Sequence, residues 1–163
     1  MDVSARPATA DDLPALVTLA TAAIEELTPL RGGEVWRRQR ARPMPPGDSL
    51  RDDLADADAH VVVGTIDGTA VGYGVLRVER LADGSLLGVI DDLFTLPGAR
   101  GVSVGEQVMD ALIARARDEG CFGVDSIALP GDRETKNFFE SFGLTARAII
   151  VHKRLDEEGS GAR

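Results

Sequence analysis

Residues 91–105 read DDLFTLPGARGVSVG, a run in which a strand pattern passes through a loop containing Pro97 and Gly98 into a helix pattern. A loop that enters a helix leaves several backbone N–H groups without intrahelical partners, and the positive end of the helix dipole adds to them. Such a place suits an anion, for example a pyrophosphate. The run lacks the Gly-Lys-Ser/Thr triplet of a Walker loop and the three glycines of a dinucleotide-binding turn. The loop alone leaves an ordinary strand-to-helix turn as an open alternative.

A helix is predicted near the start of the chain, after a short strand at residues 3–6. Thr9 and Asp12 have the spacing of a capping box, which marks the start of a helix. Apolar residues then recur at helical spacing up to Leu27 and predict one buried face. Pro29 and the glycine pair at 32–33 are expected to end this helix.

The stretch from Gly33 to Gly47 is less regular and contains several prolines, so it is expected to form a loop or a lid. Ser49 and Asp52 repeat the capping pattern and predict a short helix that ends near Asp58. Arginines crowd around Trp36 in this part of an otherwise acidic chain. They read as a solvated helix face followed by a loop, as a contact for an anion or substrate, or as an element that binds a nucleic acid or an acidic protein. These arginines are Arg31, Arg37, Arg38, Arg40 and Arg42.

Strand patterns begin at His60. The runs 60–66, 70–80 and 86–96 are rich in apolar and β-branched residues, and Asp-Gly pairs at 67–68 and 83–84 separate them. Two such turns between β-rich runs predict an antiparallel meander of three strands.

The second half of the chain alternates helix and strand patterns. A helix is predicted from about Ser103 to Glu119, and a strand at 122–129 should run parallel to the strand before residue 97 because a helix connects them. Asp132 is expected to cap a helix that ends at Gly143. A last strand is predicted at residues 145–155. The whole order predicts an α+β fold with a mixed sheet and flanking helices in one domain, residues 1–156, followed by a polar tail at 157–163.

Composition narrows the class of protein. A chain of 163 residues fits one domain, and its formal net charge of −9 disfavours a nucleic-acid surface, which needs clustered Lys and Arg. The single cysteine cannot form an intramolecular disulfide, and with two histidines it cannot build a four-ligand zinc site without carboxylates, so no metal site is predicted. No apolar run is long enough to cross a membrane and the N-terminus lacks a signal-peptide pattern. A cytoplasmic location is therefore expected.

Two motifs make the sequence similar to the GCN5-related N-acetyltransferase (GNAT) family. In that family a strand leads through a Pro-containing turn into Arg/Gln-x-x-Gly-x-Gly/Ala; here Arg100, Ser103 and Gly105 stand at the three positions, with Ser103 in place of the usual glycine. A later helix of the family carries Asn, Ala, Phe-Tyr and Gly-Phe. The residues at the same spacing here are Asp132, Thr135, Phe138-Phe139 and Gly143-Leu144.

The resemblance implies that acyl-CoA, with acetyl-CoA as the expected form, lies where the last strand of the meander and the next strand separate. It implies that backbone groups near Phe94 pair with the pantetheine arm and that N–H groups of the loop from Gly101 to Gly105 hold the pyrophosphate. The implied CoA-binding residues are Phe94, Thr95, Leu96, Arg100, Gly101, Val102, Ser103, Val104, Gly105, Asp132 and Phe139.

Direct transfer to an amine needs a base, because an alkyl amine is mostly protonated at neutral pH. Asp91 and Asp92 are the candidates by position, since members of the family often place an acid pair just before the aromatic residue. Neighbouring strand residues point to opposite faces, so the two are expected to have different roles. Asp91 is predicted to be the base, directly or through a water, and Asp92 a charge that orients the substrate. A structural acid pair at a strand kink is the alternative.

One position departs from the family pattern. Phe139 stands where many members have the tyrosine that protonates the departing thiolate, and phenylalanine cannot donate a proton. Tyr73, the only tyrosine, is expected to line the core or the cleft. The leading prediction is an N-acyltransferase acting on a small-molecule or peptide amine, and the alternative is a non-catalytic acyl-CoA-binding regulatory module. The resemblance also leaves a homodimer open.

Overall fold

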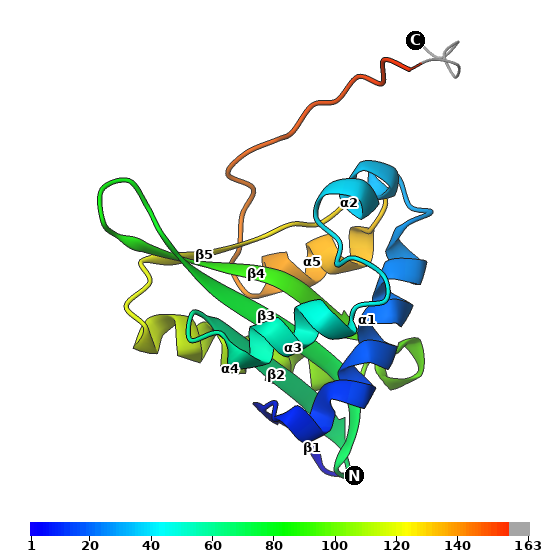
Figure 1. The fold of residues 1–163 in the computed structure, drawn as a ribbon, viewed down its shortest axis with the longest axis vertical. Coiled ribbons are helices and arrows are strands. Elements are labelled where there is room, and N and C mark those ends of the chain that lie inside the picture. Colours follow the sequence, from blue (N-terminus) through cyan, green and yellow to red (C-terminus); the bar gives the residue numbers. More distant parts are fainter. Residues whose placement is uncertain (157–163) are drawn as a thin grey trace.

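In the computed structural model, which describes residues 1–156, a five-stranded sheet has the order β1-β2-β3-β4-β5 (Figure 1). Strands β1 to β4 are antiparallel to their neighbours, and β5 runs parallel to β4. This mixed sheet confirms the predicted α+β fold, including the meander and the parallel strand that follows it. The strands are β1 (Val3–Pro7), β2 (Ala59–Ile66), β3 (Thr69–Arg80), β4 (Leu86–Thr95) and β5 (Gly123–Ser126).

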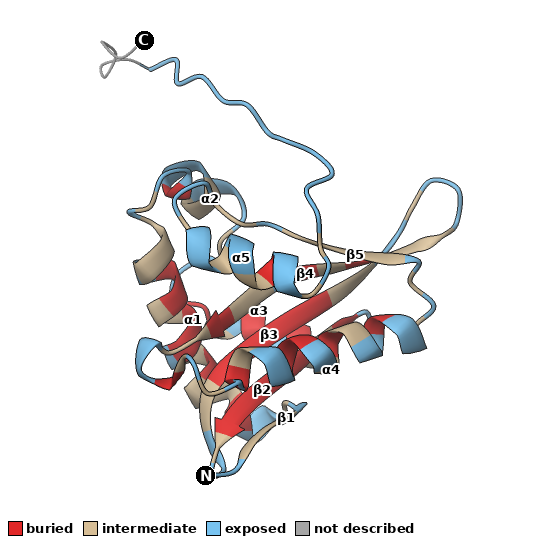
Figure 2. Ribbon diagram, turned by 180° about the vertical axis from the view of Figure 1, so that it is seen from behind, coloured by how far each residue is buried: buried red, intermediate tan, exposed pale blue. Residues whose placement is uncertain are grey.

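Helices cover both faces of the sheet. Helices α1 and α3 share a buried cluster with one face, and α4 and α5 share a second cluster with the other (Figures 1 and 2). The helices are α1 (Leu13–Leu27), α2 (Gly33–Gln39), α3 (Gly47–Ala55), α4 (Val104–Asp118) and α5 (Arg133–Ser141), with short 3₁₀ helices η1 (Ala10–Asp12) and η2 (Pro97–Ala99). Among residues 1–156, no helix is both long and apolar enough to cross a membrane.

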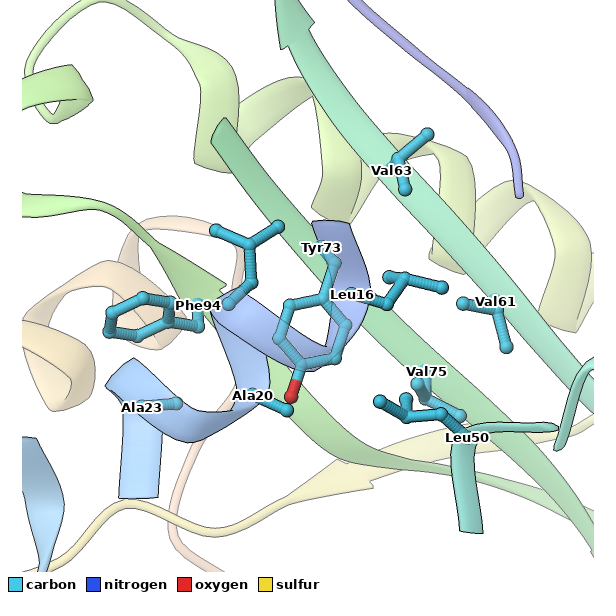
Figure 3. Close-up of a cluster of buried hydrophobic side chains, with 10 residues drawn as sticks. Leu16, Ala20, Ala23, Leu50, Val61, Val63, Tyr73, Val75 and Phe94 are labelled. Atoms are coloured by element: carbon cyan, nitrogen blue, oxygen red, sulfur yellow. The ribbon is translucent and has the colours of Figure 1, made fainter. Parts of the chain in front are cut away.

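The cluster under α1 is built by alternate residues of the sheet. Val63, Tyr73 and Val75 point toward Leu16 of α1, and Figure 3 shows the Tyr73 ring in the middle of this group. Each of these side chains is almost wholly buried. Burial of a side chain of this size contributes about 1.5–3 kcal/mol, so this cluster fixes α1 on the sheet.

Helix α4 packs directly on the backbone of the opposite face at two strand positions that are glycine. A Cβ at Gly64 would come within 2.7 Å of the side chains of Val104 and Val108, and a Cβ at Gly74 within 2.7 Å of Leu112. Neither position has room for a side chain. The two glycines therefore determine the distance between α4 and the sheet, and so also where the N-terminus of α4 lies relative to the sheet.

Strand β4 contains one extra residue. Val75 of β3 pairs with Asp92, while the next residue, Leu76, pairs with Ile90. Asp91 is therefore a β-bulge with no partner of its own, and a bulge bends its strand and re-aims side chains.

Several local predictions are confirmed. The Thr9 N–H donates to Asp12 Oδ2 (2.8 Å) ahead of α1, and the Thr135 N–H donates to Asp132 Oδ1 (3.2 Å) at the start of α5. Helix α4 agrees with its prediction within one residue, and left-handed backbone at Gly143 (φ 86°) follows α5.

Other predictions are wrong. Part of the expected loop forms α2, and α3 begins at Gly47, ahead of Ser49, whose hydroxyl donates to the Pro46 carbonyl (3.1 Å) instead of capping a later helix. Strand β5 is shorter than the predicted run 122–129. Residues 145–155 form no strand; they are exposed and leave the body of the protein (Figure 2). The predicted polar tail, 157–163, lies outside the described residues.

Candidate active site

A cavity of about 280 Å³ lies where β4 and β5 separate. The two strands pair only from Leu87–Gly123 to Ile90–Ser126, after which β4 continues to Thr95 without β5 beside it. The cavity is lined by β4, the chain after β5, and parts of α1, α2 and α5. The cleft predicted between these two strands is therefore present.

One end of the cavity is the N-terminus of α4, where Gly101 and Gly105 line the wall. Within residues 1–156, no protein group accepts a hydrogen bond from the backbone N–H groups of residues 101–106. Gly101 and Ser103 both have left-handed backbone (φ 85° and 74°), which turns the loop tightly into the helix. Unpartnered donors at a helix N-terminus fit a diphosphate group.

Gly105 and Ser103 are not equivalent in this loop. A Cβ at Gly105 would make ordinary contacts of 3.5 Å with the Phe138 ring and 3.6 Å with Thr95 Oγ1, so alanine fits there. Ser103 instead occupies the backbone region that favours glycine. Its hydroxyl makes no capping hydrogen bond to α4.

Arg100 ties the loop to the rest of the cavity. Its Nε donates to the Thr95 carbonyl (2.8 Å), its Nη2 donates to both carboxylate oxygens of Glu26 on α1 (3.1 and 3.0 Å), and the guanidinium lies 5.4 Å from the centre of the Phe94 ring. Glu26 therefore neutralises much of the charge of Arg100. Its main visible contribution is to hold the loop against β4 and α1.

Asp91 and Asp92 point to the same face of the sheet, where both line the cavity. The prediction that they face opposite sides is wrong, because the bulge at Asp91 interrupts the alternation of β4. Two carboxylates are thus brought to one wall of the cleft.

Asp92 is fully engaged by neighbouring donors. Arg42 donates to it through Nε (2.9 Å) and Nη2 (3.1 Å), and the Tyr73 hydroxyl donates to its Oδ2 (2.7 Å). Burial works to lower the pKa of Arg42, but the charges of Asp92 and Asp53 outweigh it and raise that pKa. Burial and the Asp92 charge raise the pKa of Tyr73 well above its usual value. Arg42 is therefore cationic and Tyr73 neutral.

Asp91 is in a different situation. Its Oδ2 accepts from Arg77 Nε (2.6 Å), while its Oδ1 has no hydrogen-bond partner among the described residues. Burial raises the pKa of Asp91, and Arg77 offsets only part of that rise. Asp53 joins the two halves of the network, because its Oδ2 accepts from Arg42 Nη2 (2.6 Å) and from Arg77 Nη2 (2.8 Å).

Aromatic side chains of α5 form the wall opposite β4. Phe139 is 7% exposed and lines the cavity, with the Phe138 ring 6.1 Å away between centres. No proton donor stands at Phe139. Tyr73 lines the cavity as well as the core, as the sequence predicts, but its hydroxyl hydrogen is committed to Asp92.

The cavity brings together most of the predicted site. Leu96 packs against the α1-side core and its N–H donates to the Val71 carbonyl (2.9 Å), and Val104 is buried facing β2. Val102 and Ser103 belong to the loop without lining the cavity. The predicted residues that do line it are Asp91, Asp92, Phe94, Thr95, Arg100, Gly101, Gly105, Asp132 and Phe139.

Sequence reasoning missed the partners of the acid pair. Arg42 was only one of five arginines near Trp36, and Asp53 and Arg77 had no motif around them. The only local signal was that Arg42 ends the arginine run and directly precedes Pro43. The contact of Arg42 with Asp92 spans 50 residues and that of Arg77 with Asp53 spans 24, so neither can be predicted without the fold.

Comparison with known proteins places the chain in a family. Residues 22–144 match the model of the acetyltransferase (GNAT) family, so the chain belongs to that family. This membership supports acyl transfer as its general chemistry. A comparison with curated protein sequences gives no match.

Solved structures share the fold. A tetramutant of a Bacillus halodurans protein has a TM-score of 0.79 at 19% identity, covering 95% of this chain and 100% of that one. AAC(6')-Iy in complex with a CoA-containing bisubstrate analogue has a TM-score of 0.72 at 18% identity, covering 95% and 100%. Glucosamine-6-phosphate N-acetyltransferase from Arabidopsis thaliana has a TM-score of 0.69 at 18% identity, covering 96% and 100%.

Proposed function

We propose that the protein is an N-acyltransferase that moves an acetyl or other acyl group from acyl-CoA directly onto an amine. One observation carries the proposal: a single cavity joins the carboxylate of Asp91 to the N–H groups at the start of α4, which have no partner among residues 1–156. The first feature suits a diphosphate and the second suits removal of a proton from an amine. Family membership adds the class of reaction.

The residues present fit acyl-CoA. The cradle of residues 101–106 has donors to offer a pyrophosphate, and no strand of the described residues 1–156 lies beside β4 beyond Ile90 on the β5 side to block a pantetheine arm. Bound there, acyl-CoA would supply an activated thioester, and the CoA thiol would be released.

Asp91 is the base in this proposal. Among residues 1–156 no group donates to its Oδ1, and desolvation raises the pKa of Asp91 above the ordinary aspartate value, which makes its carboxylate a better proton acceptor. Asp92 acts as a positioning residue, because three hydrogen bonds hold it to Arg42 and Tyr73. Since Phe139 cannot donate, the thiolate takes its proton from solvent.

The charge of the network favours a cationic acceptor. Two cations, Arg42 and Arg77, face three carboxylates, Asp53, Asp91 and Asp92; Arg42, Asp53 and Asp92 are largely buried, whereas Arg77 and Asp91 are about one-third exposed. One negative charge is left over at the cavity wall. One similar structure holds the bisubstrate analogue CoA-S-monomethyl-acetylneamine, and another is named for an amine-bearing acceptor, glucosamine 6-phosphate. A small-molecule or peptide amine is the acceptor class we propose here.

The test is acyl transfer to a panel of amines with the release of CoA thiol as the readout, run beside a thermal-shift titration with CoA and acetyl-CoA. A ligand at 100 times its dissociation constant stabilises a fold by about 2.7 kcal/mol, which raises Tm by roughly 5–10 °C here. Turnover by the wild-type protein that is lower in the Asp91→Asn variant supports the proposed enzyme. A Tm shift without turnover on any amine supports the non-catalytic CoA-binding module instead. The absence of a shift with every acyl-CoA contradicts both.

A further inference from the structure

Three arginines line the cavity, and one of them has no carboxylate beside it in the described chain. Arg42 pairs with Asp92 (2.9 Å) and Arg100 with Glu26 (3.0 Å). The third, Arg40, makes no ion pair and no side-chain hydrogen bond within residues 1–156, and it is exposed at the C-terminal end of α2. A guanidinium in this situation on a cavity wall suits a carboxylate or phosphate group of a ligand.

The chain places Arg40 near the proposed base. Arg40 stands two residues before Arg42, so the two Cα atoms lie within about 7 Å of each other. Arg42 in turn donates to Asp92, the neighbour of Asp91 in β4. This part of the cavity is here called the acceptor end. The loop that leads into α4, which suits the diphosphate, forms the other end, so Arg40 is available to the acceptor.

The acceptor end has charges of both signs. The network of Arg42, Arg77 and three carboxylates leaves one negative charge at the cavity wall, and Arg40 adds a positive charge that this network does not use. Glu26 is already paired with Arg100, and the remaining carboxylates of the lining lie on α4, on α5 or at the N-cap of α5. A molecule with a protonated amine and an anionic group matches this arrangement.

The cleft is also bridged by backbone contacts. The N–H of Gly131, after β5, donates to the carbonyl of Arg31 (3.3 Å) in the turn between α1 and α2 (Figures 1 and 2). The contact is close, because a Cβ at Gly32 would lie 2.9 Å from Pro130 Cδ. The cavity volume of about 280 Å³ is at the lower end of the range of roughly 300–1,000 Å³ that is typical of small-ligand pockets. A small molecule fits this space better than a polypeptide segment.

We propose that the acceptor is a small-molecule amine with an anionic group, a carboxylate or a phosphate, which Arg40 binds while the amine lies at Asp91. This inference rests on the proposed function and narrows its acceptor class. The protonated amine loses one proton to Asp91, and its nitrogen forms the amide C–N bond as the thioester C–S bond breaks. The second nitrogen proton passes to solvent, the thiolate takes a proton from solvent, and Asp91 releases its own. The anionic group only orients the acceptor.

The test compares matched acceptors. A series of ω-amino acids from glycine to 6-aminohexanoate is run beside the corresponding primary amides, and phosphoethanolamine is run beside ethanolamine. Thiol release gives kcat/KM, and calorimetry of the protein loaded with CoA gives the acceptor Kd without turnover. We expect at least one anionic acceptor to exceed its neutral partner by on the order of tenfold. The carboxylate and phosphate pairs show which anionic group Arg40 prefers.

Two variants assign the preference. Arg40→Gln should bring the ratio of anionic to neutral acceptor close to one with CoA affinity kept, and using the same pair of acceptors cancels differences in amine pKa. Arg37→Gln is the matched control, because Arg37 is on the same helix, has no ion pair within residues 1–156 and does not line the cavity. It should keep the wild-type ratio. Thermal unfolding verifies that both variants are folded.

The outcomes separate this inference from the proposed function. Turnover of neutral amines or of a short peptide as fast as of every anionic acceptor overturns the inference and leaves the acyltransferase standing. A preference that persists in Arg40→Gln also overturns it, as does a loss of CoA affinity, which would assign Arg40 to the CoA phosphates. Selective binding of an anionic acceptor that Arg40→Gln abolishes, without transfer, supports the Arg40 site and contradicts the proposed function. Neither binding nor transfer of any acceptor contradicts both.

Discussion

Arg42 and Asp92 form a two-point ion pair, with Nε to Oδ2 at 2.9 Å and Nη2 to Oδ1 at 3.1 Å. Both side chains are largely buried, at 7% and 14% exposure. Arg42 precedes Pro43 in the connection between α2 and α3, so this pair fixes that connection to β4. Because α2 contributes Trp36 to the cavity wall, the ion pair also shapes the cleft.

We expect Arg42→Met to destabilise the protein strongly. The change leaves Asp53 and Asp92 without their shared cation, and removing one partner of a buried pair costs about 3–5 kcal/mol. A fall in Tm on the order of 10 °C should appear in calorimetry. Arg38→Met is the matched control, because Arg38 pairs with Glu34 while 69% exposed and should matter little. Equal effects of the two changes would contradict a structural role for the Arg42 network.

Asp91→Asn should lower kcat by about 100-fold and leave CoA affinity unchanged, because the amide cannot take a proton. Asp92→Asn should act differently: it removes the charge that faces Arg42, so its clearest effect is a lower Tm. Steady-state kinetics, CoA titration and thermal unfolding of both variants separate the two roles. Full kcat in Asp91→Asn would remove Asp91 as the base.

Arg77→Gln should move the acidic limb of the pH profile of kcat/KM upward. The Arg77 charge lowers the pKa of Asp91, so its loss lets burial raise that pKa further. A base must be ionised to act; activity should therefore fall at acidic pH and be retained at high pH. Arg80→Gln, whose exposed guanidinium donates to the Gly84 carbonyl, is the control. An acidic limb that does not move in Arg77→Gln would mean that the ionisation of Asp91 does not determine the fall in kcat/KM at low pH.

Ser103 tests the phosphate loop. Its left-handed backbone favours glycine, so Ser103→Gly should be between neutral and about 1 kcal/mol more stable, with CoA affinity kept. Ser103→Asp suits the dipole of α4 but sets a negative charge near a bound diphosphate, so its affinity for CoA should fall roughly thirtyfold, or about 2 kcal/mol. CoA titration by calorimetry measures both. Affinity within twofold of wild type in Ser103→Asp would place the phosphates elsewhere.

Local signals explain which elements could be predicted. Apolar periodicity and the caps at Thr9 and Asp132 depend on neighbours within a few residues, and the helices they predict are present. The Asp67-Gly68 turn is similarly local, with left-handed backbone at both residues. The meander and the parallel strand after it followed from these elements, whereas the place of β1 beside β2 was not predicted.

The remaining features depend on contacts between distant residues. Nothing near Asp91 in the sequence marks it as a bulge, since the register is set by pairing with β3. The partners of the acid pair come from the α2–α3 connection, α3 and β3. The apolar pattern of residues 145–155 wrongly predicted a strand, because a strand also needs a neighbour, and no main-chain hydrogen bond within residues 1–156 reaches this segment.

The bulge makes Asp91, the first residue of the acid pair, an insertion in the strand. Ile90 and Leu93 share the α4 side of the sheet, and Asp92 and Phe94 share the α1 side, so the strand would keep its pattern of faces if residue 91 were absent. Ile90 is also the last residue of β4 that pairs with β5. The extra residue thus coincides with the point where the two strands part, and a lineage that lost it would lose the proposed base and straighten the strand at the mouth of the cleft in a single step.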